Sequence, residues 1–170
     1  MYFVFHAFFG LFAVCLVAAN SIPAIARADS YDLTGRVQIT KVSDGDSLRS
    51  GTLQIRLFGI DAPELNQECK DQNGRIWGCG IAAHRQLVTL IGTKKELQCS
   101  LRDVDRYGRL IMQCFTGSTD IGAAMVQSGH ALAYRHFSNL YITEEEQAKT
   151  ALIGIWRGTF IPPWEWRRQN

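Results

Sequence analysis

The stretch Arg56-Leu57-Phe58-Gly59-Ile60-Asp61-Ala62-Pro63-Glu64 organises the interpretation of the whole chain. An apolar run over residues 53–60, typical of a strand, carries one arginine and then breaks at a proline with a carboxylate on each side. Strand ends and the loops after them are where a rigid scaffold presents reactive groups. Taken alone, the stretch favours a structural ion pair, because such pairs are commoner than catalytic ones.

The chain of 170 residues has the length of one domain. Residues 1–28 are interpreted as a signal peptide, because residues 1–19 are almost all apolar or aromatic and Ala26-Arg27-Ala28 matches a small-x-small cleavage site. We therefore expect one domain over residues 29–170, with a short tail from about residue 157, in a protein exported to the periplasm or secreted. The alternative is an uncleaved membrane anchor, since no basic residue precedes the apolar run.

The charge of the chain is close to balanced. Residues 1–28 contain one basic residue and no acidic one, so their removal leaves a net charge of +1. Nucleic-acid-binding domains usually carry a clear basic excess, so any binding of nucleic acid must come from local sites.

Four cysteines remain once Cys15 leaves with the signal segment, and an even number in an exported chain indicates two disulfides. Cys99 and Cys114 lie in phase with alternating apolar residues on either side of a turn, and a hairpin centred at their midpoint sets them opposite each other. Opposed Cα atoms lie about 4.5 to 5.5 Å apart, within disulfide reach. This leaves Cys69 to pair with Cys79. Free thiols, a zinc site or a thiol oxidoreductase are weaker alternatives, because no CxxC spacing is present.

The remaining pattern predicts a mainly β chain. Residues 34–42 form a first strand, and residues 47–51 and 53–60 complete a three-stranded meander. Residues 65–80 form a long polar loop closed by a disulfide, and residues 131–134 form a short strand.

Three helices are predicted. The first covers residues 81–91, with Ile81, Leu87, Val88 and Ile91 on its buried face, and the second covers 121–128 after an Asp120 N-cap. The last follows a capping box at residues 143–146. The fold class is α+β, a five-stranded barrel of the OB kind with three helices.

Three motifs fall at strand ends or turns: Asp44-Gly45-Asp46, the stretch 56–64, and Asp105-Arg106-Tyr107-Gly108-Arg109. In order and spacing they resemble the thermonuclease family, the staphylococcal nuclease-like OB-fold nucleases, over roughly residues 37–156. That family has a DGD turn after the first strand, an R-x-x-x-x-D-x-P-E run ending the third, and a D-x-Y-G-R turn before the fifth.

The resemblance implies Ca²⁺-dependent hydrolysis of DNA and RNA at the 5′-oxygen, leaving 3′-phosphate ends. It also implies a set of roles: Asp46, Asp61 and the backbone carbonyl of Ala62 bind Ca²⁺, Asp44 supports them, Glu64 is the general base, Arg56 and Arg109 bind the phosphate, and Tyr107 and Tyr134 contact the nucleotide. No stable protein partner is implied, and a monomer is expected.

The chain departs from the family pattern in two places. Residues 66–80 hold only two basic residues where the family prototype has a lysine-rich stretch, and His136 replaces a second nucleotide-side tyrosine. In the tail, Trp164 and Trp166 are expected to pack on the barrel, and Arg167 and Arg168 to stay solvated. The alternative function is an OB-fold nucleic-acid-binding module without catalysis.

Overall fold

The structure, a computed structural model, describes residues 33–170, and the signal peptide predicted for residues 1–28 lies outside them. The strands are β1 (Thr34–Gln38), β2 (Lys41–Val42), β3 (Ser47–Ser50), β4 (Leu53–Leu57), β5 (Ile60–Asp61), β6 (Cys69–Asp71), β7 (Ile76–Trp77), β8 (Glu96–Val104), β9 (Leu110–Thr116), β10 (Thr119–Asp120), β11 (Leu132–Ala133) and β12 (Gly158–Thr159). The helices are α1 (Cys79–Ile91), α2 (Ile121–Gln127), α3 (Ile142–Thr150) and α4 (Pro163–Gln169), with one 3-10 turn, η1 (Gly154–Arg157). Within the described range, no helix is both long and apolar enough to cross a membrane.

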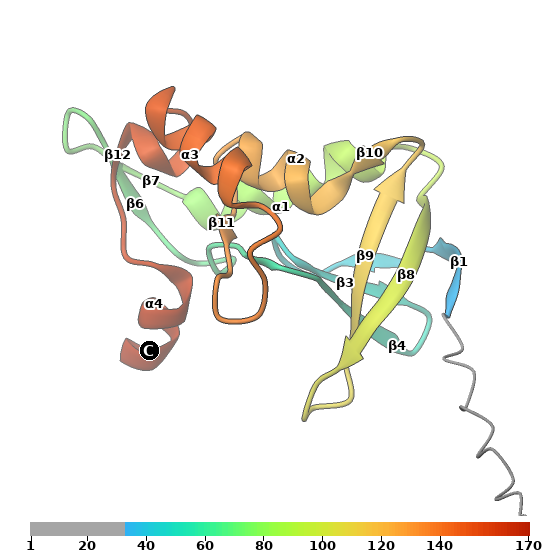
Figure 1. The fold of residues 1–170 in the computed structure, drawn as a ribbon. Coiled ribbons are helices and arrows are strands. Elements are labelled where there is room, and N and C mark those ends of the chain that lie inside the picture. The colour runs from blue at the N-terminus through green and yellow to red at the C-terminus, as the bar shows by residue number, and fades with distance from the viewer. Residues whose placement is uncertain (1–32) are drawn as a thin grey trace, which may run out of the picture. The chain divides into compact units, whose positions relative to one another are not determined.

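A mixed seven-stranded sheet carries the fold (Figure 1). Its order is β1-β8-β9-β4-β3-β2, with β10 paired to β9. The pairs are antiparallel except β4 with β9, which is parallel and joins the early meander to the later hairpin. Two small sheets, β11-β5 and β12-β6-β7, complete the described part. The predicted α+β, OB-like fold is confirmed, although the described residues form four α-helices rather than three.

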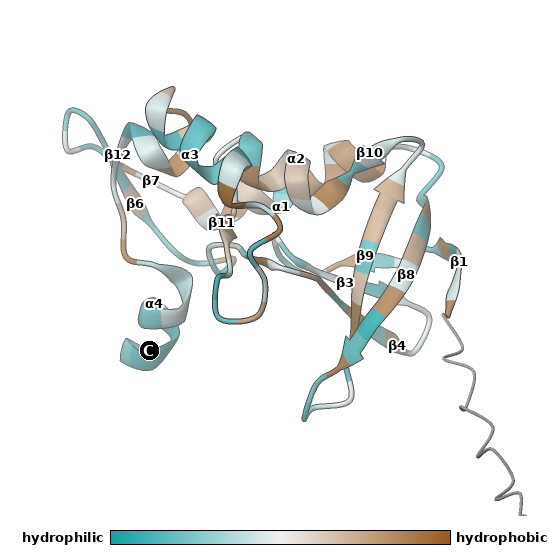
Figure 2. Cartoon of the chain, viewed as in Figure 1, coloured by the Kyte–Doolittle hydropathy of each residue, from teal (hydrophilic) through white to brown (hydrophobic). Residues whose placement is uncertain are grey.

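The main core lies between the curved sheet and helices α1 and α2. Leu48 and Ile55 come from adjacent strands, and Leu87 and Met125 come from the two helices. Figure 2 shows the apolar colouring of α2 and the more hydrophilic loop at the end of the β8–β9 hairpin. A second cluster, built on Cys69, Cys79, Leu132 and Ile155, packs against the aromatic side chains of the C-terminal segment.

Both predicted disulfides are confirmed. Cys69 is bonded to Cys79, and Cys99 is bonded to Cys114, with which it pairs across β8 and β9. The register of that hairpin shifts after Leu101, so its turn is centred on Tyr107 rather than between Arg106 and Tyr107.

Several strand boundaries differ from the prediction. The first predicted strand is divided into β1 and β2, and the third ends at Leu57, where a turn with Gly59 at a φ of 74° precedes β5. The predicted long loop over residues 65–80 instead contains the β6–β7 hairpin, which turns at Gly74. The hairpin is stable here because β6 also pairs with β12, which is distant in sequence.

Two predicted helices differ in part from the structure: α1 ends at Ile91 and buries Leu87 and Ile91 as predicted, but the rest of its face and the start of α3 are wrong. Helix α1 starts at Cys79 and buries Ala83, Leu87 and Ile91 at a spacing of four, so Ile81 and Val88 are exposed. The predicted capping box is not formed: α3 begins at Ile142, residue 141 is its N-cap, and the N-cap makes no side-chain hydrogen bond. The carboxylate of Glu145 is instead buried, where it accepts a bond from the backbone of residue 133.

Candidate active site

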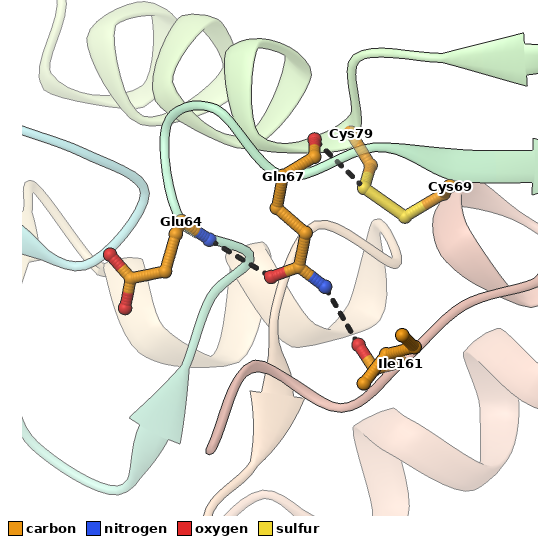
Figure 3. Close-up of a disulfide and its surroundings, with 5 residues drawn as sticks. All are labelled: Glu64, Gln67, Cys69, Cys79 and Ile161. Atoms are coloured by element: carbon orange, nitrogen blue, oxygen red, sulfur yellow. Dashed lines mark hydrogen bonds between the residues drawn. A yellow bond between two sulfur atoms is a disulfide. The ribbon is translucent and has the colours of Figure 1, made fainter. Parts of the chain in front are cut away.

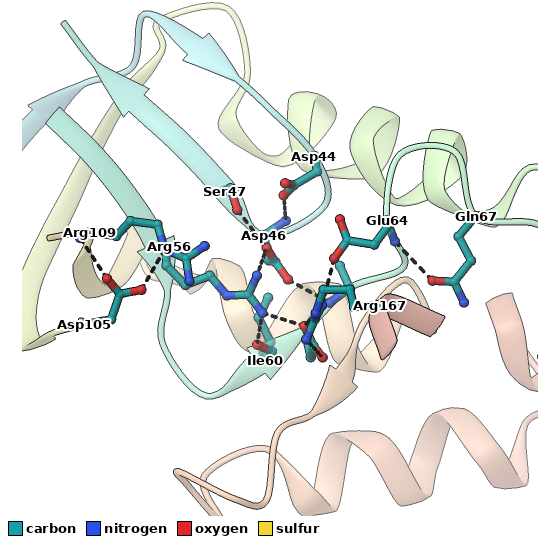
Figure 4. Close-up of polar contacts among 12 residues, drawn as sticks. Asp44, Asp46, Ser47, Arg56, Ile60, Glu64, Gln67, Asp105, Arg109 and Arg167 are labelled. Atoms are coloured by element: carbon teal, nitrogen blue, oxygen red, sulfur yellow. Dashed lines mark hydrogen bonds and ion pairs between the residues drawn. The ribbon is translucent and has the colours of Figure 1, made fainter. Parts of the chain in front are cut away.

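Arg56 is the centre of the candidate site. It lies on β4 between β3 and β9. Its Nη1 donates to Asp46 Oδ1 at 2.6 Å, and its Nη2 donates to Asp61 Oδ1 at 2.5 Å. A longer bond of 3.4 Å joins Nη2 to the carbonyl oxygen of Ile60. One guanidinium therefore holds two carboxylates from different segments in one place (Figure 4).

The Asp44-Gly45-Asp46 turn aims its second carboxylate inward. Asp44 Oδ1 accepts a hydrogen bond from the Asp46 amide at 3.0 Å, which fixes the turn. Asp46 Oδ2 accepts from the Ala62 amide at 2.8 Å. Gly45 makes this approach possible, because a Cβ there would lie 2.6 Å from the Cβ of Ala62 and 2.7 Å from that of Ala83.

Burial dominates the electrostatics of these groups. Desolvation raises the pKa of Asp46 to about 8, against the opposing effect of Arg56, and the neighbouring charges of Asp44 and Asp61 raise it further. Burial works against the charge of Arg56, but the carboxylates of Asp46 and Asp61 outweigh it and raise the arginine pKa above its ordinary value. Two buried carboxylates, those of Asp46 and Asp61, therefore share the single positive charge of Arg56, so a further cation would be attracted to them.

Glu64 lies in the loop after strand β5, at the edge of the site, with its side chain 27% exposed. Its backbone amide donates to Gln67 Oε1 at 3.2 Å, and Gln67 Nε2 donates to the carbonyl of Ile161 at 2.7 Å (Figure 3). Gln67 itself is only 1% exposed, and its own carbonyl lies 3.5 Å from Cys79 Sγ, next to the disulfide with Cys69. The loop that carries Glu64 is thus tied both to α1 and to the C-terminal segment.

Gly80 allows α1 to touch this loop. A Cβ at residue 80 would lie 1.7 Å from the carbonyl oxygen of Glu64, a distance that no side chain can tolerate. The start of α1 therefore packs directly on the Glu64 backbone.

Arg167 of α4 reaches the same carboxylates from the far end of the chain. Its Nη1 donates to Asp61 Oδ1 at 3.0 Å and to Glu64 Oε1 at 2.8 Å, and its Nη2 donates to Asp61 Oδ2 at 2.8 Å (Figure 4). These bonds raise the arginine pKa, although burial opposes this. Arg167 and Arg168 both remain exposed, as expected, but Arg167 also forms ion pairs with Asp61 and Glu64 that the sequence did not predict.

Arg109 lies beside this cluster, at the start of β9. In the parallel register Arg56 pairs with Ile111, and Arg109, two residues earlier, lies on the same side of the sheet. Its Nε donates to Asp105 Oδ2 at 2.7 Å, and the same carboxylate accepts bonds from backbone amides of the turn. The structure places Arg109 in contact with Asp105 rather than with the Arg56 cluster (Figure 4).

Tyr107 lies at the tip of the β8–β9 hairpin and is 68% exposed. The guanidinium of Arg106 lies 4.8 Å from the centre of its ring, and Arg106 Nη2 donates to its hydroxyl at 2.6 Å. The tip therefore presents an aromatic ring with a cation on it.

Tyr134 lies after β11, where it is covered by α4. The ring of Trp164 stacks on it at 5.7 Å between centroids and 24° between planes. The ring of Phe137 meets Tyr134 edge-on at 5.2 Å, and His136 lies 6.2 Å away. These side chains border an open hollow of about 500 Å³ that is also lined by α3 and η1.

Comparisons with known proteins identify the family of this chain. The family described as staphylococcal nuclease homologue matches residues 54–158. The chain belongs to this family. It is 31% identical to the micrococcal nuclease of Shigella flexneri over 177 residues, covering 93% of this chain and 91% of the relative. It is also 31% identical over 141 residues to an uncharacterized endonuclease of Haemophilus influenzae, covering 78% of this chain and 73% of the relative.

A third similar protein has a name of another kind. The succinoglycan biosynthesis protein ExoI of Rhizobium meliloti is 32% identical over 119 residues, covering 68% of this chain. The present chain spans 62% of that relative's length.

The family resemblance implies a Ca²⁺ site, and the donors present fit a hard cation. No group of three or more His, Cys, Asp or Glu side chains within residues 33–170 is arranged to hold a metal ion. However, Asp46 and Asp61 are buried carboxylates that the guanidinium of Arg56 holds close together, and carboxylate oxygens are the ligands that Ca²⁺ prefers. Arg167 supplies a positive charge to oxygens of Asp61 and Glu64, which marks where a cation is attracted.

The structure thus brings together four of the residues predicted from the sequence, and leaves three apart. Asp46, Arg56, Asp61 and Glu64 are joined directly or through Arg167. Asp44 stabilises the turn by accepting a hydrogen bond from the Asp46 amide. Arg109, Tyr107 and Tyr134 contact Asp105, Arg106 and Trp164 instead. Two neighbours of the site, Gln67 and Arg167, were not predicted as part of it.

Proposed function

We propose that this protein is a Ca²⁺-dependent nuclease that hydrolyses phosphodiester bonds of DNA and RNA at the 5′-oxygen and leaves 3′-phosphate ends. Membership of the staphylococcal nuclease family makes the chain a hydrolase of the nuclease type. One observation carries the finer proposal: Arg56 holds Asp46 and Asp61 together at the end of β4, beside Glu64. Such a cluster combines a group for binding phosphate with oxygens for binding a cation.

The cation would be held by Asp46, Asp61 and the backbone carbonyl of Ala62. Asp44 would support this set through its hydrogen bond to the amide of Asp46. When bound, Ca²⁺ would supply positive charge to the phosphoryl oxygens.

The side chains of this protein would accept the proton and bind the phosphate. Glu64 accepts a proton from the water whose oxygen bonds to phosphorus, while the bond from phosphorus to the 5′-oxygen breaks and that oxygen takes a proton from solvent. Arg56 and Arg109 offer planar forks to the phosphoryl oxygens and stabilise the charge of the transition state. For this, Arg109 must turn from Asp105 toward the substrate.

Nucleotide contacts are assigned to two tyrosines. Tyr107, exposed at the hairpin tip, is placed for a hydrogen bond to a phosphate or sugar. Tyr134 offers a ring face for stacking on a base.

A cleavage assay tests this proposal. Single-stranded DNA and RNA are incubated with the purified protein in Ca²⁺, in Mg²⁺ and in EDTA, and the ends of the products are identified. We expect cleavage in Ca²⁺ only and 3′-phosphate ends. Cleavage in EDTA would refute the metal requirement, and 5′-phosphate ends would refute the assigned bond.

Two variants test the site itself. Glu64→Gln removes the proton acceptor, and Arg109→Ala removes one phosphate fork. Arg75→Ala is the matched control, because Arg75 forms the same kind of pair with Asp71 as Arg109 forms with Asp105. We expect the first two to lower kcat/KM by at least about 100-fold, the usual range for a positioned base or charge donor. Full activity in both would refute the site assignment.

A second candidate function is a nucleic-acid-binding module without catalysis. It is favoured by one observation, the pairing of Arg167 with both Asp61 and Glu64, which occupies two groups that catalysis needs. DNA left intact in Ca²⁺ together with binding that persists in EDTA would support this alternative.

We also propose that the protein acts outside the cytoplasm as a monomer, either exported to the periplasm or secreted. The two disulfides support an oxidising compartment. An anchor formed by an uncleaved N-terminal segment is the alternative. Separating cell fractions and determining the N-terminus of the mature protein distinguishes the two, with residue 29 expected first.

A further inference from the structure

Helix α4 places two side chains, one helical turn apart, on the two halves of the candidate site. Arg167 bonds to both carboxylate oxygens of Asp61 and to Glu64. Trp164 stacks on Tyr134. One short helix therefore covers the proposed metal ligand and base together with the proposed nucleotide platform.

Each of these two contacts occupies a position that the bound cation or the nucleotide would need. The guanidinium of Arg167 lies on oxygens that a divalent cation would require, and two cations cannot share those oxygens without strong repulsion. The indole of Trp164 covers a face of Tyr134 on which a base could stack.

The chain before α4 is held through its backbone, whereas α4 is held mainly through the side chains of Trp164 and Arg167. Residues 158–159 pair with β6, and the carbonyl of Ile161 accepts the bond from the buried Gln67. Beyond Pro163, which is buried, the helix spans only residues 163–169, and a helix this short is marginal without its contacts. The side chain of Arg167 is 37% exposed, against 14% for Arg56. Release of α4 therefore requires the loss of the Arg167 bonds and of the Trp164 packing, while β12 and Ile161 stay in place.

We propose that α4 is an intramolecular cap that competes with both the divalent cation and the nucleotide for the active site, and that must be displaced before cleavage. The proposal rests on the proposed nuclease function, because it assumes that Asp61 binds the cation. It predicts that the uncleaved substrate and the metal each open the cap. An enzyme of this design stays poorly active until cation and polynucleotide are present together.

The affinity for Ca²⁺ in the absence of nucleic acid provides the main test. Isothermal titration calorimetry on the purified protein compares the unmodified chain with Arg167→Gln, and with Arg168→Gln as the matched control. Arg168 neighbours Arg167 on the same helix, but makes no ion pair among the described residues. A cap closed for about nine-tenths of the time weakens the apparent affinity about tenfold. We therefore expect Arg167→Gln to bind Ca²⁺ about tenfold more tightly, and Arg168→Gln to differ by less than twofold.

Three results would overturn the proposal. The first is an unchanged or weaker Ca²⁺ affinity in Arg167→Gln. The second is an equal gain in Arg168→Gln, which would indicate a general charge effect. The third is a lower kcat of Arg167→Gln at saturating Ca²⁺, which would make Arg167 a residue that acts on the substrate.

A second measurement follows the aromatic half of the cap. Trp164→Ala removes the ring from Tyr134, and we expect it to bind a single-stranded DNA oligonucleotide in EDTA at least about threefold more tightly, as judged by fluorescence anisotropy. Weaker binding would make Trp164 part of the nucleotide site and overturn its role in the cap.

The variant Asp61→Asn separates failure of the cap from failure of the proposed function. If Asp61→Asn binds Ca²⁺ like the unmodified chain, the proposed metal site is wrong, and the cap proposal falls with it. If Asp61→Asn loses Ca²⁺ and Arg167→Gln shows no gain, only the cap is wrong. If Arg167→Gln gains affinity but no variant cleaves nucleic acid, the cap is supported and the nuclease function is not.

Discussion

Replacing Arg56 by alanine should destabilise the whole domain as well as abolish cleavage. The side chain of Arg56 is 14% exposed and bonds to two carboxylates whose side chains are 3% and 0% exposed. Without the guanidinium, Asp46 loses its cation, and Asp61 keeps only Arg167. Breaking a buried ion pair by removing one partner costs about 3 to 5 kcal/mol. That is a large share of the roughly 5 to 15 kcal/mol that holds a domain folded.

Arg109→Ala provides the matched control for this loss. It removes the same group, also paired with an aspartate, but the two side chains are 30% and 19% exposed. Solvent screens such a pair, so we expect a loss of about 1 kcal/mol or less. Urea unfolding in EDTA, followed by tryptophan fluorescence and circular dichroism, gives both free energies of unfolding. Equal losses in the two variants, or a loss below about 1 kcal/mol for Arg56→Ala, would refute the reasoning from burial.

Three further predictions concern the loop that carries Glu64. Gln67→Ala removes two hydrogen bonds of a buried amide and should lower the free energy of unfolding by about 1 to 3 kcal/mol, measured by urea unfolding, with a lower kcat. The double variant Cys69→Ser/Cys79→Ser opens a short loop and should cost about 2 to 4 kcal/mol in the same experiment, and a cost near zero would mean that the hairpin holds itself. Gly80→Ala forces a Cβ against the carbonyl of Glu64, so we expect kcat to fall while circular dichroism stays native, and an unchanged kcat would show that the loop tolerates displacement.

Local patterns in the sequence predicted much of the fold. Cys99 and Cys114 could be paired because each lies in a strand with clear alternation and the turn between them is short. The Asp120 N-cap could be predicted because its side chain accepts a bond from a residue only three positions later. In such cases the partners are close in sequence, so the pattern itself contains the contact.

Two features differ from the sequence prediction, the β6–β7 hairpin and the buried face of α1. The β6–β7 hairpin was signalled by Asn73-Gly74, a strong turn dipeptide, but its stability depends on pairing with β12. The buried face of α1 includes Gly80 and Ala83, small residues that add little to an apolar periodicity.

The residues of the candidate site also fall into two groups, those that local motifs predict and those that only distant contacts bring together. The motifs predicted the grouping of Asp46, Arg56 and Asp61, and the structure places them in contact. Nothing local relates Arg167 to Asp61, since the two are separated by 106 positions, and a pair of arginines near a chain end is ordinarily a solvated surface. Only the folded chain, with its tail held at Gln67, brings that arginine to the site.

Burial therefore assigns different roles to two arginines that share one carboxylate. Both Arg56 and Arg167 donate to Asp61 Oδ1. Arg56 is enclosed by the sheet, so its removal leaves the buried carboxylate of Asp46 without its cation and destabilises the domain. Arg167 is held by a short helix at the surface and has solvent available when it leaves, so its removal should cost little stability. Because the contacts are alike in type, the difference in surroundings determines which arginine is a fixed part of the site and which one a cation can displace.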